Sequence, residues 1–172
     1  MASLMQDLIE VLNQEVVAYK QLLGLSSQKT PVIVSGDLKR LSEITDEEQL
    51  IVGDIQKLEK TRVSSMVDIA NVLNMDVKTL KLTDLVRMLD KRPSEQQQLA
   101  RVRDELKSIA DHVRLVNSQN QELLQGSLEM VQFEMNILES TGSAPETANY
   151  NRSADTSGDV IGVNIGRFDA RQ

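Results

Sequence analysis

Large aromatic residues and cysteine are almost missing from this chain. Its 172 residues include no tryptophan, no cysteine, two phenylalanines and two tyrosines. A core built from such a chain must be aliphatic, as the contact faces of packed helices usually are. The lack of cysteine excludes a disulfide framework and thiolate metal sites, and it fits a reducing compartment.

Basic residues are also in short supply. The chain has 19 Lys and Arg residues against 26 Asp and Glu residues, which gives a formal net charge of -7. Carboxylates repel nucleic acid and anionic membranes, so we expect neither as a partner. The first residues include Asp7 and Glu10 and lack the basic start of a signal peptide. No apolar run approaches the roughly 20 residues that a spanning helix needs, so we expect no membrane insertion. Together with the lack of a signal peptide, this leads us to expect a cytoplasmic protein.

Proline is scarce, and each of the three prolines falls at an expected helix boundary. Between these boundaries apolar residues recur every three or four positions, which is the spacing of amphipathic helices. Ser3 with Gln6 and Ser94 with Gln97 have the spacing of capping boxes, and Thr30-Pro31 has the pattern of an N-cap followed by a first helical residue. The pattern predicts a helical domain over residues 1–140, with helices over 3–27, 31–73, 83–91 and 94–140.

Two points in the predicted helix 31–73 remain open. Ser35-Gly36 could break it, and Thr45 with Glu48 could form the N-cap of a new helix. The apolar repeat passes both points without a phase jump, so we predict a continuous helix. Glu48 and Arg62 fall on its apolar face about 21 Å apart, too far to pair within one helix. Each therefore needs a partner from a neighbouring helix.

The expected fold is all-α, an elongated antiparallel bundle of three long helices plus one short helix. In the last helix the apolar row shifts at Asn120 and Ser127, as a straight helix drifts against a heptad repeat. We interpret Asn120 and Asn117 as residues that fix helix register, with a ligand contact as the alternative. After the shift the apolar row consists of Leu124, Leu128, Val131, Met135 and Leu138.

The sequence offers no catalytic constellation. Phosphotransfer domains are helical bundles with one phosphorylatable histidine, followed by Lys after three residues and Gly after four. The single histidine here, His112, has Leu115 and Val116 at those positions, which favours an ordinary surface or boundary residue. The carboxylates of residues 46–48 are consecutive, so on a helix they point about 100° apart and do not form a metal site. We expect no enzyme, no cofactor and no metal.

From residue 141 onward the composition changes. Residues 141–172 contain four glycines and no lysine, and they cannot bury enough apolar surface to offset their ordering entropy. We predict a disordered tail that folds when it binds a partner. Ile161, Ile165 and Phe168 are spaced as one face of a helix, whereas Val163 and Ile165 alternate as in a strand added to a partner's sheet. The candidate partner-binding residues are Met130, Val131, Met135, Leu138, Val160, Ile161, Val163, Ile165 and Phe168.

Three groups of short segments stand out by their order and separation along the chain. They are Ser35-Gly36-Asp37-Leu38 with Leu41, Thr45 and Glu48, then Leu58-Glu59 with Arg62, and finally Asn117, Asn120, Leu123-Leu124 and Ser127-Leu128. In this order and separation they resemble the FlgN family of flagellar export chaperones over roughly residues 1–138. The ending 166–172 is also similar to the end of such tails in Gram-positive-type flagellar systems.

The resemblance implies a cytoplasmic chaperone for hook-associated proteins, which form the hook–filament junction. Such a chaperone prevents premature assembly of its client and delivers it to the flagellar type III export gate. Its C-terminal region would cover the client's terminal helices, and the export ATPase complex is a further implied partner. Tyr150 is the implied contact for the gate. The glycines of the tail depart from a plainly amphipathic helix.

Two other functions remain open at this point. The first is a structural coiled-coil adaptor without a secretion client, which would dimerise through the apolar row of the last helix. The second is the His112 phosphotransfer domain. For the chaperone we expect a monomer or a weak dimer.

Overall fold

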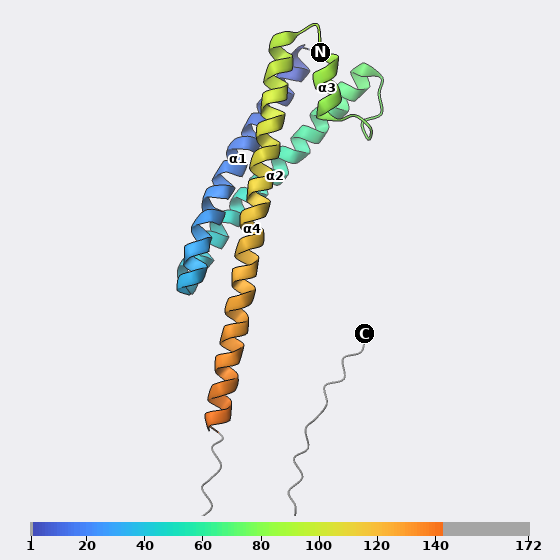
Figure 1. The fold of residues 1–172 in the computed structure, drawn as a ribbon. Coiled ribbons are helices and arrows are strands. Elements are labelled where there is room, and N and C mark those ends of the chain that lie inside the picture. Colours follow the sequence, from blue (N-terminus) through green and yellow to red (C-terminus); the bar gives the residue numbers. More distant parts are fainter. Residues whose placement is uncertain (1, 143–172) are drawn as a thin grey trace, which may run out of the picture. The chain divides into compact units, whose positions relative to one another are not determined.

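The computed structural model describes residues 2–142, and every regular element in this range is a helix (Figure 1). The predicted all-α class, with three long helices and one short one, is confirmed. The helices are α1 (Ala2–Ser35), α2 (Leu38–Leu73), α3 (Leu82–Met88) and α4 (Pro93–Gly142).

The chain divides into two units, Met1–Glu134 and Met135–Gln172, and only the end of α4 is described in the second unit. Apart from its first two residues, which end α4, the predicted tail lies outside the described residues. The same holds for the candidate residues Tyr150, Val160, Ile161, Val163, Ile165 and Phe168.

The predicted boundary between the first two helices is wrong. The first helix does not end at Ser27 but runs through Pro31 to Ser35. Proline removes one backbone donor from a helix, yet Ile33, two residues later, is buried at 5% exposure. Burial of Ile33 in this last turn favours the helix over the break that proline alone predicts.

The break occurs instead at Gly36, so the predicted helix 31–73 is not continuous. Gly36 has φ +71°, the left-handed conformation that ends many helices. The backbone N–H groups of Gly36 and Asp37 donate to the carbonyls of Ile33 and Val32, at 3.2 and 3.3 Å. Asp37 then caps α2, because its Oδ1 accepts from the backbone N–H of Arg40 at 3.0 Å.

At the second open point, Thr45 with Glu48, the predicted continuity of the helix is confirmed. Thr45 lies inside α2, and its hydroxyl donates to the carbonyl of Leu41 at 2.8 Å. The bounds of α4 agree with the prediction to within two residues. The short α3 begins one residue before the predicted 83–91 and ends three residues earlier. At its start, the Asp84 carboxylate accepts from the backbone N–H of the N-cap residue Lys81 at 3.1 Å.

Cross-helix contacts fix the directions of the long helices within the first unit. Along α1, Glu15 contacts Arg62 and Ser26 contacts Glu48, so α1 and α2 are antiparallel. Lys20 contacts Glu105 in α4, and the later Thr30 contacts the later Asn120, so α1 and α4 run in parallel. Successive long helices are therefore antiparallel, as predicted.

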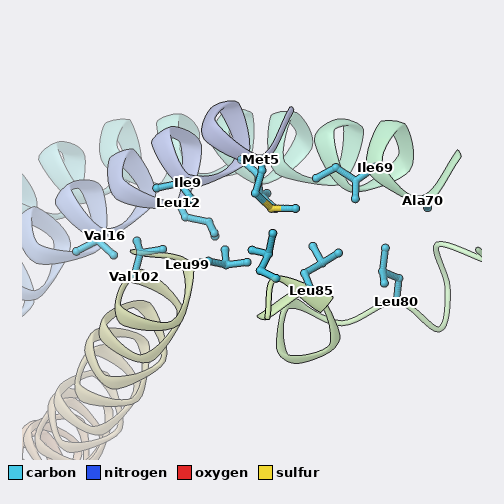
Figure 2. Close-up of a cluster of buried hydrophobic side chains, with 12 residues drawn as sticks. Met5, Ile9, Leu12, Val16, Ile69, Ala70, Leu80, Leu85, Leu99 and Val102 are labelled. Atoms are coloured by element: carbon cyan, nitrogen blue, oxygen red, sulfur yellow. The ribbon is translucent and has the colours of Figure 1, made fainter. Parts of the chain in front are cut away.

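The main core lies where all four helices meet, and it is aliphatic as expected (Figure 2). Leu12 of α1, Ile69 of α2, Leu85 of α3 and Leu99 of α4 have no exposed surface, so α3 is part of the core. A second cluster follows along the helices, made of Ala18, Leu22, Ile55 and Val113.

Candidate functional site

The apolar face of α4 changes from buried to exposed along the helix. Leu99, Val102 and Val113 are buried against the other helices. Asn120 is the last buried residue among those whose side chains are described. Leu124, Leu128 and Val131 follow at steps of three and four, so they continue the same face. This face therefore stays apolar where it is no longer buried.

The candidate residues of α4 lie on this exposed part. In the first unit, Met130 is 65% exposed and Val131 is 52% exposed. In the second unit, Met135 is 49% exposed and Leu138 is 69% exposed. Their accessibility suits partner binding, which itself stays a prediction.

Sequence reasoning missed further apolar residues of this surface. Phe133 is 64% exposed, and Leu123 and Ile137 are exposed as well. They were overlooked because they do not fall on the predicted apolar row. The signal was present, since Phe133 is one of only two phenylalanines and stands among polar neighbours.

A buried hydrogen-bond cluster fixes α4 against α1 just before the exposed part begins. The Asn120 amide donates to the carbonyl of Ser26 at 2.7 Å, and its Oδ1 accepts from the Thr30 hydroxyl at 2.7 Å. Asn120 is 3% exposed, whereas Asn117 is exposed. These contacts support the interpretation that Asn120 fixes the register of α4 against α1, because both polar atoms of its side chain form hydrogen bonds with α1.

Glu48 of α2 anchors the same end of the bundle. Its Oε1 accepts from the Ser26 hydroxyl at 2.7 Å, and its Oε2 accepts from the Lys29 ammonium at 2.8 Å. The two side chains of the Lys29–Glu48 ion pair are 16% and 12% exposed. The expected partners from a neighbouring helix are thus confirmed for Glu48.

The same expectation is confirmed for Arg62, whose guanidinium pairs with Glu15 of α1. Burial raises the pKa of Glu15 above its usual value, and the positive charge of Arg62 offsets part of this effect. Nearby, the Tyr19 hydroxyl donates to Glu59 at 3.3 Å. Burial, followed by the charge of Glu59, raises the pKa of Tyr19. These groups link α1 to α2 and belong to the structural part of the molecule.

The exposed part of α4 carries charge of one sign. Between Arg114 and Arg152 the sequence has no lysine and no arginine. The charged residues of α4 in that interval are all glutamates: Glu122, Glu129, Glu134 and Glu139. An exposed apolar surface bordered by carboxylates is suited to a partner that is apolar and basic.

The arrangement offers no sign of catalytic chemistry in the part of the chain that is described. His112 is exposed, with Leu115 and Val116 at the positions where a phosphotransfer domain has Lys and Gly. Among residues 2–142 no group of three His, Cys, Asp or Glu side chains could hold a metal ion. None of the described helices is long and apolar enough to span a membrane.

Comparison with known proteins adds a second line of evidence. The family model described as FlgN protein matches residues 1–158, a range that contains all four helices. A curated relative, the "Uncharacterized protein YvyG" of Bacillus subtilis (strain 168), is 24% identical over 146 residues. The matched region covers 85% of this chain and 84% of the relative. No solved structure matches the sequence.

Proposed function

The chain belongs to the FlgN family of flagellar export chaperones, and we propose that its clients are hook-associated proteins of the hook–filament junction. In this proposal the protein acts in the cytoplasm. It keeps a client monomeric before export and delivers it to the flagellar type III export gate, with the export ATPase complex as a further partner.

The observation that supports this proposal is the exposed apolar surface of α4. Contiguous exposed apolar patches on a folded protein mark interaction sites. Leu128 and Val131 lie on a helix face that is buried upstream, so a client helix can continue the packing that α1 and α2 provide there. A client whose terminal helices assemble with copies of itself would have those helices covered by this face.

The tail is the second part of the proposed client site. Val160, Ile161, Val163, Ile165 and Phe168 would contribute apolar contacts, and Tyr150 would contact the export gate. A segment that folds on binding spends part of its interaction energy on ordering, which keeps the affinity moderate. Moderate affinity suits a chaperone that must release its client.

The proposal is tested by titration calorimetry with purified hook-associated proteins from the same organism. We expect the full chain to bind at least one of them as a one-to-one complex. The double variant Leu128→Ser/Val131→Ser should weaken binding by about tenfold or more, because it removes exposed apolar contacts without touching the core. The matched control Gln125→Ser changes an exposed polar residue on the polar side of the same helix and should leave the affinity unchanged.

A chain that ends at Ser140 tests the tail separately. Circular dichroism should show that the helices remain, while calorimetry should show loss of client binding. Unchanged affinity of this shortened chain would remove the tail from the proposed site. Failure of every hook-associated protein to bind the full chain would refute the client assignment.

A further inference from the structure

The apolar residues of α4 between positions 123 and 133 form two rows on different sides of the helix, and all of them except the half-buried Leu124 are exposed. The first apolar row consists of Leu124, Leu128 and Val131, and it continues the face that is buried upstream. The second apolar row consists of Leu123, Met130 and Phe133, which are 36%, 65% and 64% exposed. All six residues belong to the first unit. Leu123 follows the buried Asn120 by three positions and is the least exposed of the three, whereas Met130 and Phe133 are mostly exposed, so the packing of the bundle does not account for these two residues.

The angle between the rows follows from helix geometry. With 3.6 residues per turn, the centres of the two rows are about 140° apart around the helix axis. Ser127 and Glu134 lie between them on the narrow side, and Gln125 and Glu129 lie on the broad polar side. Together the rows span about 220° of the circumference, whereas the apolar stripe of a helix packed on one side is about 100° wide. One neighbouring helix cannot cover both rows.

Charge indicates what kind of helices would cover them. Glu122, Glu129 and Glu134 are the charged residues along this part of α4, and no cation accompanies them between Arg114 and Arg152. Helices that pack on the rows with Lys or Arg at their borders would neutralise these carboxylates. A second copy of this segment would instead bring the same glutamates together, and like charges at a contact oppose association.

We propose that a single client occupies both rows with two amphipathic helices whose borders are basic, so that α4 lies between them. This proposal rests on the proposed function for the identity of the client. The arrangement itself depends only on the two rows and on the charge around them. It also explains the exposure of Phe133, which a single client helix on the first row would leave in water.

Site-specific photo-crosslinking in cells that assemble flagella tests the proposal with the full chain. A benzophenone amino acid is placed in turn at the positions of Leu128, Phe133 and Gln125, and crosslinked peptides are identified by mass spectrometry. We expect positions 128 and 133 to reach two different segments of one hook-associated protein. Both segments should be amphipathic and carry Lys or Arg at their borders. Position 125 lies on the polar side and should give at most about a tenth of the crosslinks.

The outcomes separate this inference from the proposed function. Two basic segments of one identified protein that is not hook-associated would support the two-helix site and refute the client assignment. Crosslinks from 128 and 133 to the same client segment would overturn the two-helix site and leave the client assignment intact. A second copy of this chain at position 133, or no crosslink from that position, would also overturn the two-helix site.

A binding measurement with the purified hook-associated protein gives a second, independent reading. The variants Leu128→Ser/Val131→Ser and Met130→Ser/Phe133→Ser should each raise Kd by about tenfold or more, since each removes one helix contact. Raising the salt concentration from roughly 50 to 300 mM should weaken binding of the full chain severalfold, because exposed charge pairs are screened. Full affinity of the Met130→Ser/Phe133→Ser variant would contradict the second helix contact.

Discussion

Arg62 Nε of α2 donates to Oε1 of Glu15 in α1 at 2.9 Å, and the two residues differ sharply in their access to water. The Glu15 side chain is 1% exposed and the Arg62 side chain is 32% exposed. The second oxygen of Glu15 has no hydrogen-bond partner in the described structure. A buried carboxylate with one unpaired oxygen costs free energy when it is charged, and this cost depends on pH.

The first prediction is that Glu15→Gln changes the pH dependence of stability. Burial raises the folded-state pKa of Glu15, so its contribution is fully present below the unfolded pKa and is lost as pH rises through the folded pKa. A glutamine keeps the shape and one acceptor for Arg62 but carries no charge. The free energy of unfolding of the variant, relative to the natural chain, should therefore increase from pH 4 to pH 8. Urea unfolding followed by circular dichroism measures it.

Glu105→Gln is the matched control for that measurement. Lys20 lowers the pKa of the exposed Glu105 through a hydrogen bond and its charge. Its contribution is therefore present above the unfolded pKa and is lost as pH falls through the folded pKa, the opposite sign. A Glu15→Gln difference that is constant with pH, or that slopes like the control, would contradict the assignment.

The second prediction concerns the hydrogen bonds that join α4 to α1. Asn120→Ala should lower the free energy of unfolding by about 1–3 kcal/mol, because it removes the acceptor of the half-buried Thr30 hydroxyl and the buried hydrogen bond to the Ser26 carbonyl. The exposed Asn117 is the control, and Asn117→Ala should change stability by less than about 0.5 kcal/mol. Equal effects of the two substitutions would rule out the buried cluster as the link between these helices.

The third prediction tests the helix boundary at Gly36. A Cβ atom at Gly36 or at Gly53 would meet no atom within 4 Å, so only backbone conformation distinguishes the two positions. Gly36→Ala should destabilise the protein by about 1–2 kcal/mol, because its φ is +71°. Gly53→Ala, inside α2, should stabilise it by about 0.5–1 kcal/mol. A stabilising Gly36→Ala would mean that α1 and α2 are one helix.

The fourth prediction separates folding from binding. Leu85→Ala removes a fully buried side chain of α3 and should cost about 2–5 kcal/mol of stability. Leu128→Ala removes an exposed side chain and should change stability by less than about 0.5 kcal/mol, while it weakens client binding. Thermal unfolding and calorimetry on the same samples check both statements. Leu128→Ala with full client affinity, or a Leu85→Ala chain as stable as the natural one, would contradict this division of roles.

Much of the fold could be predicted because amphipathic spacing is a local property of the sequence. The repeat gave the helical class, and it showed that Glu48 and Arg62 need partners on another helix. The boundary at Pro31 was mispredicted because burial of Ile33 outweighs the cost of one missing backbone donor, and such burial is not visible in local spacing. The alternative break at Gly36 was recognised, but it was outweighed by an apolar repeat that happens to continue across the turn.

The candidate site was only partly predictable for a related reason. An apolar row predicts a contact face, but it does not say whether the chain itself covers that face. Leu128 and Val131 have the same spacing as the buried Leu99 and Val102, and only the structure separates the exposed residues from the buried ones. Phe133 was missed because it belongs to a second row, and a search for one repeat finds one row.

We propose that this chain holds a hook-associated protein in a soluble complex through the exposed apolar surface of α4. Sedimentation velocity of an equimolar mixture tests it most directly. We expect one species with the mass of one chaperone and one client, which is lost with Leu128→Ser/Val131→Ser and kept with Gln125→Ser. Two independently sedimenting proteins in the natural mixture, or an intact complex with the α4 variant, would contradict it.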